Sequence, residues 1–247
     1  EANVSEPTVN RFCRSMDTRG FPDFKLHLAQ SLANGTPYVN RNVNEDDSVE
    51  SYTGKIFESA MATLDHVRHS LDKSAINRAV DLLTQAKKIA FFGLGSSAAV
   101  AHDAMNKFFR FNVPVVYSDD IVLQRMSCMN CSDGDVVVLI SHTGRTKNLV
   151  ELAQLAREND AMVIALTSAG TPLAREATLA ITLDVPEDTD IYMPMVSRLA
   201  QLTVIDVLAT GFTLRRGAKF RDNLKRVKEA LKESRFDKQL LNLSDDR

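Results

Sequence analysis

The sequence has little cysteine and no long apolar run. Its three cysteines are too few for a disulfide framework, which is typical of a protein kept in a reducing compartment. No apolar stretch is long enough to span a membrane, and no signal-peptide pattern opens the sequence. We therefore expect a soluble, cytoplasmic protein.

An excess of charge of one sign is also missing. The formal net charge of −2 excludes a wholly basic nucleic-acid-binding protein, although it allows one basic face. With 247 residues, of which 44% are hydrophobic and 25% charged, the chain is expected to form one large or two modest globular domains. Because it begins with Glu1 rather than methionine, we expect it to be part of a longer protein.

The first 48 residues predict two short helices and a linker. Ser5 can cap the first helix, and Pro7 suits its first turn. Gly20 interrupts the pattern, and Pro22 starts the second helix. Residues 34–48 are rich in Asn, Gly, Pro and acidic side chains and lack periodicity, so they predict the linker. The apolar side of the first helix is Val9, Phe12, Cys13 and Met16, and that of the second is Phe21, Phe24, Leu28 and Leu32.

The remainder predicts an α/β fold. A long helix from Asp47, with Glu50 as its capping-box partner, and a second helix at 73–86 come first. Five apolar runs follow, separated by helical patterns, and a further helix is expected at 193–210. Runs that are apolar throughout are typical of strands buried on both faces, so we expect a five-stranded parallel sheet flanked by helices, an αβα sandwich. The runs are residues 89–93, 113–118, 135–141, 161–167 and 177–185.

The C-terminal residues 215–238 are basic but keep one apolar face. We expect their charges to cover a solvated face, and contact with a phosphate backbone is the alternative. The helices at 48–86 and 193–232 together carry more apolar stripe than one small sheet can cover, which predicts a homodimer. The apolar face of the basic segment is Phe220, Leu224, Val227 and Leu231.

Two hydroxyl-rich loops follow the first and third predicted strands. GLGSS (93–97) and SHTGRT (141–146) both lie at the carboxyl end of a strand, where open parallel sheets bind ligands. The second loop offers three hydroxyls, a glycine that lets the backbone turn its amides toward a ligand, and the N-terminus of a helix that begins near Arg145. These groups predict a phosphate site, although Ser, Thr and Gly can also do no more than cap a helix.

A nucleotide site is the alternative for the first loop. Gly93, Gly95 and Ala98 fit the dinucleotide fingerprint G-x-G-x-x-G/A. Asp119 or Asp120 stands near the end of the second strand, where a ribose-binding acid belongs. That interpretation gives SHTGRT no role, and neither loop contains the Gly-Lys-Ser/Thr of a Walker site. We therefore favour a polyhydroxylated, phosphorylated ligand and expect no cofactor.

The motifs GLGSS, SHTGRT and SRLAQLTVID (197–206) resemble the SIS (sugar isomerase) phosphosugar-binding domain. VSEPTVNRFCRS followed by GFPDFK (20–25) resembles the end of the helix-turn-helix domain of RpiR-type bacterial transcriptional regulators. The resemblance covers nearly the whole chain and implies a homodimeric regulator of sugar (hexose) catabolism, whose binding to a palindromic double-stranded DNA operator responds to a phosphorylated sugar acid. For one regulator of this family that the chain resembles, the implied effector is 2-keto-3-deoxy-6-phosphogluconate. The implied domains are the C-terminal part of the helix-turn-helix domain at 1–33, a linker at 34–48 and the SIS domain at 49–247.

The resemblance also assigns site residues. The DNA-reading helix falls on Ser5 to Ser15, and a carboxylate of the effector would need Arg145 or Arg198. Two features depart from the family: Asp17 stands where a glycine is usual, and the helices that should precede Ser5 are missing. The implied DNA-binding residues are Ser5, Thr8, Asn10, Arg11 and Arg14. The implied ligand-binding residues are Gly93, Gly95, Ser96, Ser97, Ser141, His142, Thr143, Gly144, Arg145 and Thr146.

Other constellations are weaker. Cys128-Met-Asn-Cys131 has no second pair, so a loop between a helix and a strand is favoured over a metal site. His66 and His69 lack a nearby acid or a third ligand, and we expect them on the surface.

A sugar-phosphate isomerase or related lyase on the same fold is the second hypothesis. Its candidate base is Glu187, with no histidine after His142 to assist it. An isomerase leaves the N-terminal segment without use, so we expect no catalytic residue and no metal. Turnover of a sugar phosphate would reverse this choice.

Overall fold

The structure, a computed structural model, describes residues 6–15, 18–25, 42–191 and 193–231. By internal contacts the chain divides into two units, Glu1–Ala62 with Glu187–Pro194 and Thr63–Pro186 with Met195–Arg247. Several predicted features lie outside the described residues: Ser5, Met16, Asp17, Leu28, Leu32 and most of the linker at 34–48.

The first unit contains the predicted N-terminal helix. This helix, α1 (Glu6–Ser15), is followed by a helical turn at 21–25. Cys13 is buried, and its carbonyl oxygen accepts hydrogen bonds from the amide and the hydroxyl of Thr18, at 3.2 and 2.5 Å. These bonds close the end of α1, so the helix and its break are confirmed over the described residues.

The long helix α3 (Val49–Ser70) is confirmed, but its predicted capping box is wrong. The amide of Ser51 donates to Ser48 Oγ at 3.2 Å, so the cap comes from Ser48 and not from Asp47. The carboxylate of Asp47 instead accepts from Lys55 Nζ at 2.7 Å and from the amide of Asn44 at 2.8 Å. These two bonds lower the pKa of Asp47 to about 2.

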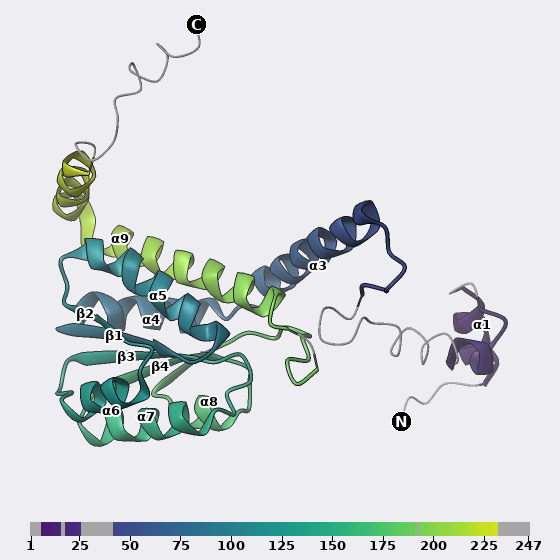
Figure 1. Cartoon of the computed structure of the whole chain (residues 1–247), viewed down its shortest axis with the longest axis horizontal. Coiled ribbons are helices and arrows are strands. Elements are labelled where there is room, and N and C mark those ends of the chain that lie inside the picture. Colours follow the sequence, from purple (N-terminus) through teal and green to yellow (C-terminus); the bar gives the residue numbers. More distant parts are fainter. Residues whose placement is uncertain (1–5, 16–17, 26–41, 192, 232–247) are drawn as a thin grey trace, which may run out of the picture. The chain divides into compact units, whose positions relative to one another are not determined.

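The second unit is built on a five-stranded parallel sheet with the order β2-β1-β3-β4-β5, which confirms the predicted fold class (Figure 1). The three inner strands are buried almost throughout, as runs of Val, Ile, Leu and Phe predict. The two edge strands are shorter than the predicted runs. The strands are β1 (Lys88–Gly93), β2 (Val115–Tyr117), β3 (Asp135–Ile140), β4 (Met162–Thr167) and β5 (Leu179–Thr182).

Helices cover both faces of this sheet (Figure 1). One face carries α4 (Lys73–Gln85), α5 (Ser96–Phe108) and α9 (Val196–Ala230), with the short helix η1 (Phe109–Phe111) after α5. The other face carries α6 (Ile121–Met129), α7 (Lys147–Glu158) and α8 (Pro172–Glu176).

Adjacent phenylalanines of β1 show how the two layers form. Phe91 packs against Phe108 of α5, whereas Phe92 joins the cluster that contains Leu149 and Leu152 of α7. None of the helices within the described ranges is long and apolar enough to cross a membrane.

The last helix, α9, runs past the predicted end at 210 and breaks at Gly217 (φ 77°, ψ −164°). Beyond the break, the ring of Phe220 meets those of Phe111 and Phe212 with centroids 5.6 and 5.8 Å apart. Leu224 and Val227 are half-buried. Phe220, Leu224 and Val227 of the predicted apolar face are therefore partly covered, whereas Leu231 is 47% exposed and does not join them.

Candidate functional site

The two hydroxyl-rich loops meet at one point of the sheet edge. β1 and β3 are neighbours, and the last residue of β1, Gly93, is in register with Ile140 at the end of β3. From there the chain leaves β1 toward α5 on one face of the sheet and leaves β3 toward α7 on the other (Figure 1). Such a divergence opens the crevice in which doubly wound sheets bind ligands.

The first loop turns tightly from strand to helix. A Cβ on Gly93 would lie 2.6 Å from the carbonyl oxygen of Ser97, so only glycine fits there. Gly95 (φ 58°) precedes α5 without a side-chain cap, and the amide of Ser97 donates to the carbonyl of Leu94 at 3.2 Å. Ser97 is buried and Ser96 half-buried, so the first turn of α5 sits against the end of β1.

The second loop uses two of its three predicted hydroxyls to brace its own backbone. Ser141 is buried, and its Oγ accepts from the amide of Gly144 at 3.1 Å. Thr143 Oγ1 accepts from the amide of Arg145 at 3.4 Å. Thr146 is the N-cap of α7, which therefore begins slightly later than predicted, and its side chain makes no capping hydrogen bond. A half-buried hydroxyl at a helix N-terminus is suited to bind an anion.

A third loop, TSAGTP at 167–172, holds the second one in place. The amide and the hydroxyl of Ser168 donate to the carbonyl oxygen of His142 at 3.1 and 2.7 Å. The amide of Leu173 donates to the carbonyl oxygen of Gly144 at 3.1 Å. The SHTGRT loop is therefore fixed along its length by the loop after β4.

Gly144 shows how closely these two loops pack. Its backbone has φ 58°, and a Cβ there would collide with the hydroxyls of Thr167 and Thr171. Sequence reasoning missed both threonines and Ser168. The signal was present, because TSAGTP repeats the hydroxyl and glycine content of the other two loops at the end of a further strand.

The electrostatics of the crevice suit an anion. The helices α5 and α7 start there, and neither has an acidic residue in its first turn. Arg145 is exposed at the second loop, and Arg198 is exposed in the first turn of α9. Across the described part of the chain, no group of three or more His, Cys, Asp or Glu side chains could hold a metal ion.

The acids proposed for other site types have different surroundings. Of the two acids considered for a dinucleotide site, Asp120 caps α6 by accepting from the amide of Leu123 at 2.9 Å, and Asp119 is exposed. Glu187, the candidate base of an isomerase, falls in the first unit and not in the unit of the sheet.

The structure also shows the surroundings of the cysteine and histidine pairs. Cys128 is buried, and burial raises the pKa of its thiol to about 12, which disfavours the thiolate that would bind a metal. The expectation that His66 and His69 lack a nearby acid was wrong, because His66 Nε2 lies 3.8 Å from Asp184 and His69 Nδ1 lies 3.4 Å from Asp65. Both histidines are exposed, as predicted.

The predicted DNA-binding residues of α1 differ in their exposure. Thr8, Arg11 and Arg14 are exposed. Asn10 is half-buried, and its Oδ1 accepts from the amide of Phe21 at 3.2 Å, which ties α1 to the following turn. Asn10 therefore serves the packing of these helices.

Comparison with known proteins matches both parts of the chain. Residues 82–211 match the SIS domain family, and residues 1–35 match the helix-turn-helix domain of the rpiR family. The HTH-type transcriptional regulator HexR of Pseudomonas aeruginosa is 57% identical over 235 residues, which cover 95% of this chain and 82% of that protein.

Solved structures share the fold. The Vibrio vulnificus NanR protein complexed with ManNAc-6P has a TM-score of 0.68 at 24% identity, covering 95% of this chain and 83% of that one. A phosphoheptose isomerase from Francisella tularensis has a TM-score of 0.55 at 19% identity, covering 67% of this chain and 98% of that one. The fold by itself therefore does not separate a regulator from an isomerase.

The sheet and its crevice define an SIS-domain protein, and the N-terminal helices add a helix-turn-helix segment. The chain belongs to the rpiR family of helix-turn-helix transcriptional regulators that carry an SIS domain, and it is similar to HexR through both parts.

Proposed function

We propose that the protein regulates genes of sugar (hexose) catabolism, binding DNA through its N-terminal helices and a phosphorylated sugar acid through its SIS domain. The observation that carries this proposal is the 57% identity to HexR over 95% of the chain. The proposed effector is 2-keto-3-deoxy-6-phosphogluconate. The proposed domains are 1–33 for DNA binding, 34–48 as a linker and 49–247 for effector binding.

The phosphate of the effector belongs at the N-terminus of α7. There Thr143 and Thr146 add hydroxyls to the backbone amides, while Ser141 keeps the turn closed. We assign Ser97, on the facing loop, to the hydroxyl or keto groups of the sugar. The carboxylate needs a cation, for which Arg145 and Arg198 are the two candidates. The NanR structure, which holds a phosphorylated sugar in a related fold, supports this class of ligand.

The DNA contacts belong to the exposed side of α1. Arg11 and Arg14 lie three residues apart on this helix, so both can reach one groove of DNA. In a protein that includes the preceding helices, replacing an arginine that reads a guanine edge by alanine should cost about 1–3 kcal/mol. If the double variant Arg11→Ala/Arg14→Ala keeps full operator affinity in a gel shift, α1 is not the recognition helix.

A thermal-shift experiment tests the effector site. At a hundredfold excess over Kd, 2-keto-3-deoxy-6-phosphogluconate should stabilise the protein by about 2.7 kcal/mol, and the unphosphorylated 2-keto-3-deoxygluconate should add almost nothing. Ser97→Ala should reduce the shift, whereas Ser74→Ala, an exposed serine on α4, should not.

Two results would contradict the proposal. Equal stabilisation by the phosphorylated and the neutral sugar would mean that the protein does not recognise the phosphate group. Conversion of a hexose or pentose phosphate at ordinary enzymatic rates would assign the crevice to an isomerase instead.

A further inference from the structure

A glutamine on α6 is buried in a way that calls for an explanation. Gln124 has 0% of its surface exposed. Its Nε2 donates to the carbonyl oxygen of Ser118 at 2.7 Å and to that of Gly93 at 3.5 Å. Its Oε1 is the buried side-chain atom that has no hydrogen-bond partner among the described residues. A buried carbonyl without a hydrogen-bond partner costs free energy that an apolar side chain of the same size would avoid. We therefore look for a role of the Gln124 side chain in the two hydrogen bonds that its Nε2 donates.

The amide lies where the sheet splits. β1 is paired with β2 only as far as Phe91 and Tyr117, but it stays paired with β3 up to Gly93 and Ile140. β2 ends at Tyr117, so its pairing with β1 stops two residues before Gly93. At this point Gln124 supplies the donor instead, and it bridges the carbonyls that end β1 and follow β2.

This bridge acts on the first loop of the crevice. Gly93 begins the GLGSS loop, and it packs so closely on the first turn of α5 that a Cβ would lie 2.6 Å from the carbonyl oxygen of Ser97. The backbone of Gly93 therefore lies directly against that of Ser97, so a bond that holds Gly93 also bears on the position of Ser97. Gln124 itself is held, because α6 is capped by Asp120 and buries Cys128.

We propose that Gln124 is a positioning residue of the effector site: its side-chain amide fixes the end of β1 and so sets the direction in which the GLGSS loop presents Ser97. This inference rests on the proposed function of the crevice. It does not require Gln124 to touch the ligand, and its full burial fits a role played through Gly93.

The test compares Gln124→Met with the wild-type chain. Methionine has a similar volume and removes the unpartnered Oε1, so the variant should fold, although the carbonyls of Ser118 and Gly93 lose the donor that Gln124 supplies. Hydrogen exchange should then become faster at the amides of Ser97 and Ala98, which are bonded to Leu94 and Gly95. The affinity for 2-keto-3-deoxy-6-phosphogluconate should fall about tenfold, the effect of one misplaced hydrogen bond.

Two further variants separate positioning from general stability. Leu83→Ala empties a fully buried site on α4 and should lower the melting temperature without changing exchange at Ser97 or the affinity. Gln124→Asn keeps an amide that is one methylene shorter, so its effects on both measurements should lie between wild type and Gln124→Met. If Gln124→Met does not fold, the exchange and affinity of Gln124→Asn test the proposal in its place.

Unchanged exchange at Ser97 and Ala98, or the same change in Leu83→Ala, would overturn the proposal. Unchanged affinity in Gln124→Met would overturn it as well. The exchange measurement needs no ligand, so it tests whether Gln124 positions the loop even if the wild-type protein binds no sugar phosphate. A wild-type protein that binds no sugar phosphate would refute the proposed function, and not the positioning by Gln124.

Discussion

Gly144 is the residue at which backbone conformation and packing constrain the candidate site together. Its φ of 58° strains any residue with a side chain, and a Cβ would also collide with Thr167 and Thr171. We expect Gly144→Ala to destabilise the fold by about 2–4 kcal/mol, the sum of a left-handed conformation and an overpacked contact. Chemical denaturation measures the loss.

Gly170 provides the matched control for this substitution. It has φ 70°, but a Cβ there meets nothing within 4 Å. Gly170→Ala should therefore show the conformational cost alone, about 1 kcal/mol. Equal losses at the two positions would mean that the SHTGRT and TSAGTP loops do not pack as described.

Asp47 gives a pH-dependent effect with a defined sign. Its bonds to Lys55 and Asn44 lower its pKa from 3.8 to about 2 in the folded state. The unfolded chain therefore takes up the proton first as the pH falls, and the carboxylate's contribution to stability is complete above 3.8 and lost toward pH 2. An NMR titration of the Asp47 carboxyl carbon measures the midpoint. Lys55→Met should raise that midpoint, whereas Lys73→Met should leave it unchanged; a midpoint indifferent to Lys55 would contradict the ion pair.

At the scale of elements, the sequence predicts the strands that are buried on both faces. β1, β3 and β4 are apolar because both faces are covered, and their runs were recognised almost to the residue. β2 and β5 are edge strands that pair on one side only, so their apolar runs continue beyond the paired residues.

The features that the sequence did not predict depend on contacts that the folded chain makes. Asp47 looks like a helix cap in sequence, but Lys55 and Asn44 hold its carboxylate in another role. Gln124 is one polar residue in a short helix, and nothing local indicates that it caps the strand end at Gly93. The positions of GLGSS and SHTGRT were predictable because the topology of a parallel sheet places them, whereas the bracing of one loop by TSAGTP required the fold.

The break in α9 yields a prediction at this scale. Gly217 (φ 77°) turns the chain so that Phe220 reaches Phe111 and Phe212. Gly217→Ala should strain this turn and destabilise the protein by about 1–2 kcal/mol, and it should also expose Phe220. Gly54→Ala, at an open position inside α3, should instead stabilise by about 0.5–1 kcal/mol. Opposite signs in thermal denaturation are the expected outcome, and stabilisation by both would mean that α9 is one straight helix.

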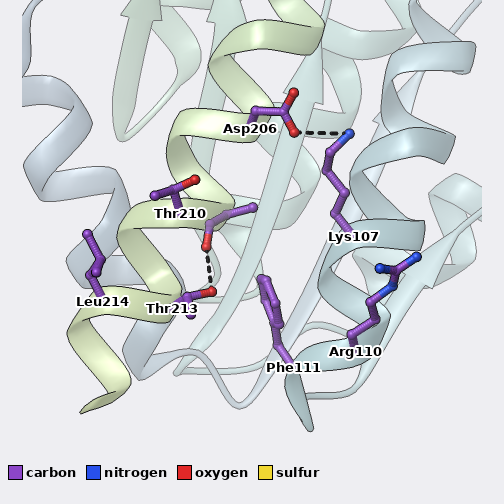
Figure 2. Close-up of a pocket in the computed structure, with 8 residues that line it drawn as sticks. Lys107, Arg110, Phe111, Asp206, Thr210, Thr213 and Leu214 are labelled. Atoms are coloured by element: carbon purple, nitrogen blue, oxygen red, sulfur yellow. Dashed lines mark hydrogen bonds and ion pairs between the residues drawn. The ribbon is translucent and has the colours of Figure 1, made fainter. Parts of the chain in front are cut away.

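At the scale of the whole molecule, α9 exposes several large apolar side chains among its polar and charged ones. Leu214 is 66% exposed, and Val207 and Leu199 are each 40% exposed on the same helix. Between α9 and α5, Leu214 lines a hollow of about 310 Å³ in which Lys107 pairs with Asp206 at 3.2 Å (Figure 2). Exposed apolar side chains beside a fixed ion pair suit an interface that a second copy covers.

We therefore expect a homodimer that uses this face of α9. Sedimentation at micromolar concentration should give twice the monomer mass, and the double variant Val207→Asp/Leu214→Asp should give the monomer, because two buried carboxylates without partners cannot be accommodated. Leu123→Asp, at an exposed leucine of α6 on the opposite face of the sheet, should leave the dimer intact. A palindromic operator engages two recognition helices at once, so the monomeric variant should lose operator affinity while its effector-induced thermal shift persists. A wild-type monomer would refute the homodimer, and a dimer broken by Leu123→Asp and not by the α9 variant would place the interface elsewhere.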